Sequence, residues 1–392
     1  MIVHMKKFFH AIGRKKLIII SLLLVLALAG GACFVGVHSL SRLLPSQLAA
    51  ERWQGDSEQS YTQISCFIPV DESVTLSSIA TFREAAATKL HEAAVDIASD
   101  EVLMTDAWSC SYKVSVSSAL GKGEVYATAV GGEFFTFHPI RLISGSYITS
   151  SDLMQDRVLL DEDTAWLLFG GTDIQGLSMK INGVPFIVAG VIEREEDYAT
   201  QKAYTDGMGI FISYDAYGLL SASAAATAAA DTSANTGTAA VSGGEAGIQC
   251  YEFVMADPVK NFALSLAKEK FPIGRGEIVD NTSRFKLSSL WALLKDFDTR
   301  SMQTRGIIYP YWENAARGVE DRAALLMLLG IVLLIVPAVA LIVCIVRYAV
   351  VGKQKLEEDV LPRWKDGAEE AVRVRARRRW EKKHNYTGEH EK

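Results

Sequence analysis

The sequence has few of the residues that bind metals or form disulfides, with 5 cysteines and 7 histidines among 392 residues. No His-x-x-x-His or Cys-x-x-Cys spacing occurs, and the isolated histidines His38, His91 and His138 are expected to be structural or surface residues. A Gly-x-x-x-x-Gly-Lys-Ser/Thr loop is also missing, since AIGRKK and LGKGE have the wrong spacing. We therefore expect no metal, no other cofactor and no ATP bound through a P-loop of this chain.

Charge is spread unevenly along the chain. A charged fraction of 22% with 9% aromatic residues excludes a chain that is disordered throughout. Residues 1–47 carry six basic and no acidic side chains, whereas residues 48–346 carry 37 acidic and 21 basic ones. Because nucleic acids are bound by clustered lysine and arginine, this acidic central part argues against a nucleic-acid partner.

Two long apolar runs predict membrane spans at residues 17–37 and 323–346. A helix crosses the hydrocarbon core with about 20 apolar residues, and both runs are long enough. A cleaved signal peptide usually has an apolar region of about 7–15 residues, which is shorter than the first run. A lipoprotein signal ending at Cys33 usually has Leu where this chain has Gly30. The first run is therefore predicted to be an uncleaved span, and Pro337 is tolerable in the second.

The basic residues beside the two runs predict the orientation. Five precede the first run (Lys6, Lys7, Arg14, Lys15 and Lys16), and Arg347, Lys353 and Lys355 follow the second. Positive flanks stay in the cytoplasm. We expect a basic cytoplasmic N-terminus at 1–16, an extracytoplasmic segment at 38–322 and a basic cytoplasmic tail at 347–392.

The first part of the extracytoplasmic segment predicts a strand, a helix and two further strands. A strand-like run covers 63–69, and apolar residues spaced by three and four between Ile79 and Ile97 predict a helix over 76–98. Alternation over 108–116 predicts a half-buried strand, which a Gly turn connects to a strand at 125–130.

Residues 141–218 are richer in β signals and glycine turns. A hairpin is predicted with its turn at Asn182-Gly183, and a short helix is predicted to start at Asp161 or Asp163 and to end at Gly170. The acidic run Asp161-Glu162-Asp163 is explained by helix capping, which leaves no catalytic constellation. The chain is therefore not expected to be an enzyme.

Residues 221–247 consist largely of Ala, Ser, Thr and Gly, and we expect a mobile insert there. A second strand–helix unit follows, with a strand at 249–255 and an N-cap at Asp257-Pro258. Its helix stripe is expected from Val259, Phe262 and Leu266, and 276–281 is expected to close the unit as a strand. Residues 286–322 are predicted to be a mostly helical stalk that Pro310 interrupts.

Three cysteines, Cys66, Cys110 and Cys250, lie outside the membrane in this scheme, so at most one disulfide can form among them. Alternation places Cys66 and Cys110 on apolar faces, which allows either buried free thiols or a bridge. For a bridge, Cys66–Cys110 is the first choice and Cys66–Cys250 the second. Cys33 and Cys344 are expected to be packing residues in the spans.

The stretch from Gly145 to Glu193 resembles the periplasmic core domain of MacB-type ABC transporter permeases, the FtsX-like permease family. The residues that carry the resemblance are Gly145, Asp152, Ala165, Phe169, Gly170, Gly176, Gly183, Gly190 and Val191. The resemblance implies an α+β extracytoplasmic domain in a bacterial plasma membrane protein, and in this chain the two predicted transmembrane helices flank it. It has two parts: a porter-like strand–helix–strand region at 58–140 and 248–285, and a small β-rich lobe inserted into it at 141–218.

The resemblance also implies partners. Family permeases have three spans after the ectodomain and a cytoplasmic helix that docks on an ATPase, whereas this sequence shows one such span. We therefore expect a non-catalytic subunit or accessory of an ABC export or mechanotransmission complex, with a separate ABC ATPase and a four-span permease. It is expected in a homo- or hetero-oligomer and in contact with membrane lipid. The alternative is a membrane-anchored binding or sensor protein without a transport role.

The basic tail from Arg363 to Lys383 has nine basic and four acidic side chains. It is compatible with a solvated helix or disordered end, with an arm on the anionic inner leaflet, and with a docking arm for a cytoplasmic partner.

Overall fold

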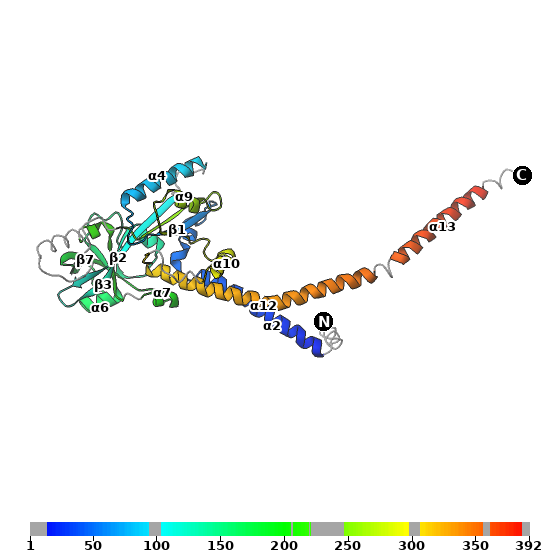
Figure 1. The fold of residues 1–392 in the computed structure, drawn as a ribbon, viewed down its shortest axis with the longest axis horizontal. Coiled ribbons are helices and arrows are strands. Elements are labelled where there is room, and N and C mark those ends of the chain that lie inside the picture. Colours follow the sequence, from blue (N-terminus) through cyan, green and yellow to red (C-terminus); the bar gives the residue numbers. More distant parts are fainter. Residues whose placement is uncertain are drawn as a thin grey trace. The chain divides into compact units, whose positions relative to one another are not determined.

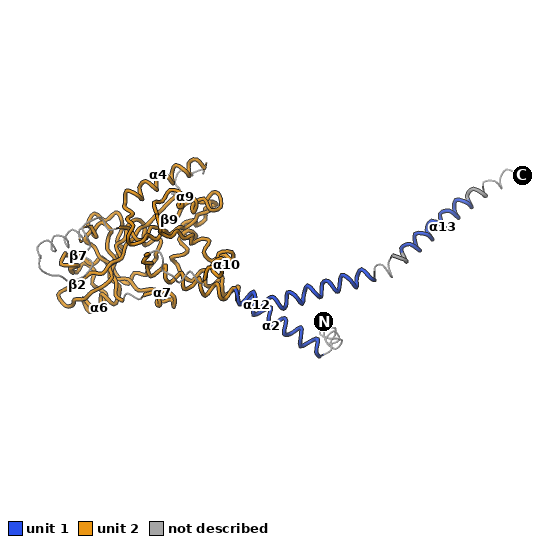
Figure 2. The backbone as a smooth tube through the Cα atoms, viewed as in Figure 1, with its two compact units in different colours: residues 1–33, 328–392 blue, residues 34–327 orange. Residues whose placement is uncertain are grey.

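The computed structural model describes residues 14–93, 103–204, 207–218, 220, 247–297, 306–355 and 361–385. The chain divides into two compact units, one formed by residues 1–33 and 328–392 and the other by residues 34–327 (Figure 2). Apart from Gly247, the predicted insert at 221–247 lies outside the described residues.

Both predicted spans lie in long helices, α2 (Arg14–Ser41) and α12 (Tyr311–Lys355), which are apolar and long enough to cross a membrane. Between residues 328 and 351, α12 exposes many large apolar side chains, which suits a lipid environment. The two helices approach closely, because a Cβ atom on Gly30 of α2 would lie 2.6 Å from Cγ of Leu334 in α12. Helix α13 (Leu361–Asn385) covers the basic tail.

Within the described residues, ten strands form one sheet in the order β10-β1-β9-β2-β3-β8-β5-β7-β4, and β6 pairs with both β2 and β7. The strands are β1 (Tyr61–Phe67), β2 (Met104–Ser117), β3 (Lys122–Gly132), β4 (Leu142–Gly145), β5 (Arg157–Asp161), β6 (Ser178–Ile181), β7 (Val184–Ile192), β8 (Gly209–Ser213), β9 (Cys250–Ala256) and β10 (Glu277–Asp280). The second strand–helix unit belongs to the same sheet as the first, because its strand β9 lies between β1 and β2.

The β-rich residues 141–218 continue this sheet and do not form a separate one. Strand β8 pairs in parallel with β3 and antiparallel with β5, so it joins the two parts that the sequence suggested. Backbone hydrogen bonds thus run from β10 to β4 without a break in strand order.

One face of the sheet, which we call the apolar face, is covered by α4 (Leu76–Glu92) and α9 (Phe262–Lys270) (Figure 1). The predicted stripe of α4 is buried, and its members are Ile79, Phe82, Ala86 and Leu90. The ring of Phe82 packs against Tyr251 and Phe253 of β9 and against Phe271 at the end of α9. The predicted continuation to residue 98 lies partly outside the described residues, as α4 ends at Glu92.

The remaining helices are short, and two sequence predictions in this part are confirmed. In the described part of the chain they include η1 (Pro45–Leu48), α3 (Ala49–Gln54), α5 (Phe134–Phe137), α6 (Glu162–Phe169), α7 (Tyr198–Ala203), α10 (Leu287–Lys295) and a helical turn at 214–218. Asp161 caps α6 by accepting a hydrogen bond from the Thr164 N–H, and Gly170 ends it with a φ of 74°. The β6–β7 hairpin turns at Asn182 and Gly183, both with positive φ.

The predicted N-cap of the next helix is wrong. Helix α9 begins at Phe262, and its N-cap is Asn261 in a left-handed conformation. Asp257 still binds the first turn of α9, because one of its carboxylate oxygens accepts a hydrogen bond from the Ala263 N–H. The other carboxylate oxygen accepts a hydrogen bond from the Thr62 hydroxyl. Val259 is 67% exposed and is not part of the buried stripe.

The structure also contradicts both disulfide choices. Because β9 separates β1 from β2, Cys66 and Cys110 are two strand spacings apart, about 10 Å, and a disulfide needs Cα atoms within about 7 Å. Cys250 lies opposite Phe67 and Ser109, so it faces the other side of the sheet from Cys66 and Cys110. All three are buried free thiols, and burial raises the pKa of Cys110 to about 12.

Candidate functional site

The second face of the sheet, opposite the apolar face, is polar where α12 packs against it. We call this side the stalk face. Gln63 and Ser65 of β1 and Glu252 of β9 project from it and are each at most 3% exposed. The Ser65 hydroxyl donates to Oε1 of Glu252 at 2.7 Å. A buried polar face needs partners in the element that covers it, since an unpaired buried polar group is destabilising.

His138 supplies one such partner. Its Nε2 lies 2.5 Å from Oε2 of Glu252, and both side chains are almost completely buried. The imidazole ring also lies 4.5 Å from the ring centroid of Trp312 in α12. The expectation of a structural histidine agrees with this place, but the sequence did not indicate the partner, which is 114 residues away.

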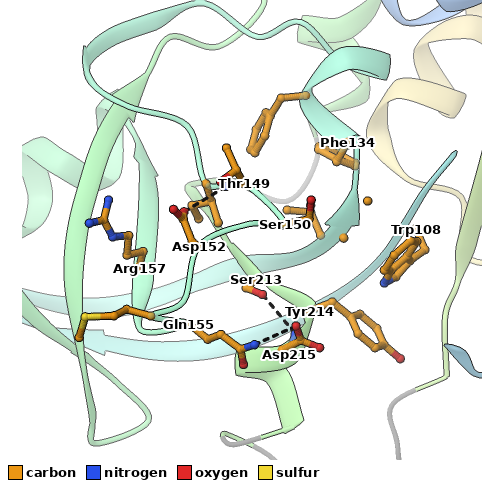
Figure 3. Close-up of a pocket in the computed structure, with 16 residues that line it drawn as sticks. Trp108, Phe134, Thr149, Ser150, Asp152, Gln155, Arg157, Ser213, Tyr214 and Asp215 are labelled. Atoms are coloured by element: carbon orange, nitrogen blue, oxygen red, sulfur yellow. Dashed lines mark hydrogen bonds between the residues drawn. The ribbon is translucent and has the colours of Figure 1, made fainter. Parts of the chain in front are cut away.

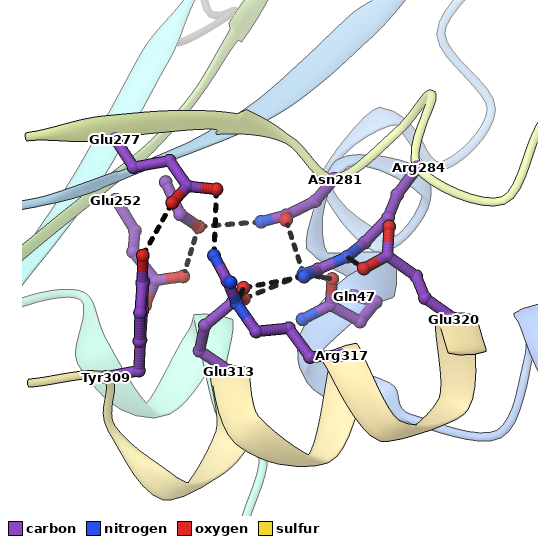
Figure 4. Close-up of polar contacts among 10 residues, drawn as sticks. Gln47, Glu252, Glu277, Asn281, Arg284, Tyr309, Glu313, Arg317 and Glu320 are labelled. Atoms are coloured by element: carbon purple, nitrogen blue, oxygen red, sulfur yellow. Dashed lines mark hydrogen bonds and ion pairs between the residues drawn. The ribbon is translucent and has the colours of Figure 1, made fainter. Parts of the chain in front are cut away.

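Arg284 occupies the centre of a buried charge cluster (Figure 4). Its guanidinium donates two hydrogen bonds, at 2.6 and 2.7 Å, to the carboxylate of Glu313 in α12. Its Nε lies 3.1 Å from the carboxylate of Glu320, which is also in α12. It also donates to Oε1 of Gln47 at 3.1 Å. The paired side chains of Arg284 and Glu313 are 2% and 1% exposed.

Arg317 extends the cluster to the edge strand β10. Its Nε donates to Glu313 at 2.7 Å and its second nitrogen donates to Glu277 at 2.8 Å. The guanidinium lies 3.9 Å from the ring centroid of Tyr309, whose hydroxyl donates to Glu277 at 2.5 Å. The charge cluster therefore consists of Arg284, Arg317, Glu277, Glu313 and Glu320.

Three members of the cluster, Arg284, Arg317 and Glu313, are held in their charged forms. Burial acts to raise the pKa of the Glu313 carboxyl, but Arg284 and Arg317 outweigh burial and hold that pKa below its usual value. For both arginines, burial opposes the charged form, and the surrounding carboxylates still raise the pKa. Arg284, Arg317 and Glu313 thus depend on their partners for their charge.

This arrangement connects three segments of the chain. Asn281 links the cluster to the stalk face, because its amide donates to Ser65 and its carbonyl accepts from Arg284. Among the described residues, no group of three or more His, Cys, Asp or Glu side chains is arranged to hold a metal. Removing one partner of a buried ion pair is strongly destabilising, about 3–5 kcal/mol, so the cluster fixes α12 in one register on the sheet.

The residues of the family resemblance lie elsewhere in the same unit, in the β-rich part. Gly145 and Gly190 are direct partners in the β4–β7 ladder, and a Cβ on Gly145 would lie 2.1 Å from the Ala189 carbonyl oxygen. These glycines therefore allow two backbones to approach closely. The others are Ala165 and Val191, which are fully buried, Phe169, which ends α6, and Gly170, Gly176 and Gly183, which have positive φ.

Asp152 lies in a small pocket of about 60 Å³ between the loop before β5 and the start of the helical turn at residues 214–218 (Figure 3). Its Oδ2 accepts a hydrogen bond from the Thr149 N–H at 3.1 Å, and its own N–H donates to the Thr149 carbonyl. Asp152 thus shapes a turn and is distant in the sequence and in the sheet from the charge cluster.

Comparison with known proteins places the chain in a family. Residues 40–243 match the model of the MacB-like periplasmic core domain. No curated protein sequence matches the chain. Among solved structures, the extracellular domain of the noncanonic ABC-type transporter YknZ from Gram-positive bacteria is 12% identical, with a TM-score of 0.33, and the match covers 54% of this chain and 92% of that one.

The periplasmic region of MacB from Actinobacillus actinomycetemcomitans is 13% identical, with a TM-score of 0.33, over 61% of this chain and 94% of that one. The family match covers more than half of the 392 residues and includes all nine residues of the resemblance. The mixed α+β sheet domain and the two helices that are apolar enough to span a membrane agree with it. This chain belongs to the family of membrane proteins with a MacB-like periplasmic core domain, the MacB-like permeases of ABC transporters.

Proposed function

We propose that this chain is a non-catalytic subunit of an ABC export or mechanotransmission complex, in which α12 passes movement between its apolar segment and the sheet. The observation that carries this proposal is that α12 contains both residues of the buried charge cluster and the second apolar run. One uninterrupted helix holds the buried charge-cluster residues Glu313, Arg317 and Glu320 near its start and the second apolar run further on. A displacement of such a helix along its axis acts directly on the buried partners in the sheet.

The proposal places the chain in a bacterial plasma membrane, with both termini in the cytoplasm and residues 38–322 outside. The basic flanks of both apolar runs support this orientation. ATP is hydrolysed by a separate ABC ATPase, and a four-span permease completes the assembly as a homo- or hetero-oligomer. The basic helix α13 is exposed from Trp364 to Glu381 and is available to anionic lipid or to the ATPase.

Cysteine labelling tests the orientation. Leu120 is 79% exposed at the β2–β3 turn, so Leu120→Cys should react with an impermeant maleimide in intact cells. Lys392→Cys should react only after lysis. The opposite pattern would refute the orientation, and the buried native thiols Cys66, Cys110 and Cys250 give little background because their pKa values are raised.

Helix continuity is the part of the proposal that can be tested most sharply. Two glycines cost a helix interior about 2 kcal/mol relative to two alanines, so Leu328→Gly/Leu329→Gly should soften α12 without touching the charge cluster. Leu328→Ala/Leu329→Ala is the matched control. The chain is purified with its ABC ATPase, reconstituted in nanodiscs, and the protease sensitivity of the ectodomain is compared with and without ATP.

We expect an ATP-dependent change in the parent and in the alanine control, and its loss in the glycine variant with ATPase activity retained. A change that persists in the glycine variant would contradict transmission through α12. If no ATPase co-purifies and no ATP response occurs with any added partner, the anchored sensor replaces the transport subunit as the better explanation.

A further inference from the structure

A cavity of about 240 Å³ lies on the stalk face beside the charge cluster. Its floor is formed by β2 and β3, and residues 308–311, which end at the first residue of α12, also line it. The side chains that decide its chemistry are Ser109, Ser111 and Thr128 on the floor and Tyr126, Tyr204 and Tyr311 on the walls. This volume is below the range of about 300–1,000 Å³ that is typical of sites for drug-sized ligands.

The walls offer aromatic ring surface. The rings of Tyr204 and Tyr311 stack at 4.3 Å with an angle of 25° between their planes. Both hydroxyls donate to the Glu195 carboxylate, so their hydrogen-bonding capacity is directed away from a ligand. Because Tyr204 and Tyr311 stack on each other, what they present to the cavity is apolar ring edge, and the half-buried Tyr126 adds a further aromatic ring to the lining.

The floor offers hydroxyl groups. The Ser111 and Thr128 hydroxyls lie 3.3 Å apart, and they share one side of the sheet because their residues are direct partners in the β2–β3 ladder. Each hydroxyl has one donor and two acceptor positions, so a single contact between them leaves most of this capacity for a ligand. An apolar ligand would cover these groups without pairing them, which is unfavourable.

The charged side chains of the lining neutralise each other. Nε of Arg194 donates to Oδ2 of Asp161 at 2.8 Å, and the guanidinium lies 4.8 Å from the ring centroid of Tyr204. An anionic ligand would have to displace Asp161 from Arg194, and a cationic ligand would have to displace Arg194 from Asp161. The lining therefore favours an uncharged ligand.

From this combination we infer that the cavity binds an uncharged, polyhydroxylated ring of monosaccharide size. The volume of about 240 Å³ lies just below the range typical of drug-sized ligands, which suits a single six-membered ring. The C–H face of the ring packs on the tyrosine wall, and its hydroxyls pair with the floor. The inference stands independently of the transport proposal, because it depends only on the lining of the cavity.

A bound ring would also touch the start of the stalk helix. Tyr309 and Tyr311 line the cavity, and the Tyr309 hydroxyl donates to Glu277 of the charge cluster. Occupancy of the cavity is therefore linked to the position of the segment from which α12 begins.

Calorimetric titration of the full chain in nanodiscs tests the inference. The probes are glucose, galactose and N-acetylglucosamine as uncharged rings, glucuronate and glucosamine as charged analogues, and indole as an aromatic ring without hydroxyls. At least one uncharged sugar should bind saturably with a Kd of about 1 mM or tighter, and the charged analogues and indole should bind at least about tenfold more weakly.

Variants locate the binding. Ser111→Ala/Thr128→Val keeps the approximate shape of the floor and removes two of its three hydroxyls, so affinity should fall about tenfold or more. Tyr126→Ala removes ring surface at a half-buried position and gives a second, independent disruption. Thr88→Val, on the exposed side of α4, is the matched control and should bind as the parent does.

The inference is overturned if none of the uncharged sugars binds, if a charged analogue or indole binds more tightly than all of them, or if both floor and wall variants retain the parent affinity while melting at the parent temperature.

Discussion

The two faces of the central sheet are both buried, but one is covered by apolar contacts and the other by paired polar groups. On the apolar face, Phe82 of α4 packs among aromatic rings, and the covering helix contributes an apolar stripe. On the stalk face, Glu252 and Ser65 are equally buried, but each is paired with another polar group. The covering helix α12 contributes charged side chains instead of a purely apolar stripe.

The two kinds of contact differ in whether they fix the position of a helix on the sheet. Apolar contacts tolerate small shifts, because dispersion and the hydrophobic effect are not directional. A bidentate arginine–carboxylate pair has a fixed geometry and loses most of its favourable energy when the helix slides. We infer that the apolar face holds the domain together and that the stalk face specifies where α12 sits.

Arg284→Met should have the largest effect. It removes the positive charge between Glu313 and Glu320 and leaves two carboxylates close together in a buried site. The expected loss is about 3–5 kcal/mol in the free energy of unfolding. Denaturant unfolding of the purified chain in detergent measures it.

Arg275→Ala is the control for this variant, since Arg275 also pairs with two acidic residues but is 62% exposed. Its loss should stay below about 1 kcal/mol. Equal losses in the two variants would mean that the contribution of the cluster to the free energy of unfolding does not depend on its burial.

Ile79→Ala probes the apolar face with a slightly smaller expected loss, about 2–4 kcal/mol, because it leaves a cavity under α4. The unfolding free energy of this variant should keep the pH dependence of the parent, since no charged group is removed. Thr88→Ala on the exposed side of the same helix should change stability by less than about 0.5 kcal/mol. A change in pH dependence caused by Ile79→Ala would show that the two faces are not separable.

The two faces also differ in how much of them the sequence predicted. The buried stripe of α4 on the apolar face was predictable because its members recur every three or four residues. The charge cluster was not, because Arg284 and Glu313 are 29 residues apart and look like ordinary surface charges. One local signal was present, the i,i+4 pair of Glu313 and Arg317.

The order of the strands in the sheet explains why the disulfide predictions were wrong and why the cavity was not predicted. Alternation correctly placed Cys66 and Cys110 towards the interior, but it contains no information about which strand lies between them. The position of β9 depends on contacts between segments nearly two hundred residues apart. The hydroxyl floor of the 240 Å³ cavity was missed for the same reason, since serine and threonine on alternating positions predict a solvent-exposed strand face.

Acid should weaken the stalk face first. Glu313 has a lowered pKa in the folded chain, so its contribution to stability is complete above its usual value near 4.5 and is lost as the pH falls through the lowered value. The melting temperature should therefore decrease from pH 5 downwards. In Arg284→Met/Glu313→Gln, which removes both charges of the pair, this decrease should be smaller. An unchanged slope in the double variant would assign the acid sensitivity to other carboxylates.

Arg83→Met gives the smallest effect and the closest comparison between the faces. Arg83 and Asp106 form a bidentate pair at 2.6 and 2.7 Å, the same distances as Arg284 and Glu313, but on the apolar face with Arg83 46% exposed. Water can replace the guanidinium at that edge, and the Tyr251 hydroxyl still donates to Asp106, so the loss should be about 1 kcal/mol. Denaturant unfolding of Arg83→Met beside Arg284→Met measures how much burial and the additional partners of Arg284 contribute when the pair distances are equal. A loss from Arg83→Met as large as that from Arg284→Met would mean that pair geometry, and not the surroundings of the stalk face, determines how firmly a helix is held on this sheet.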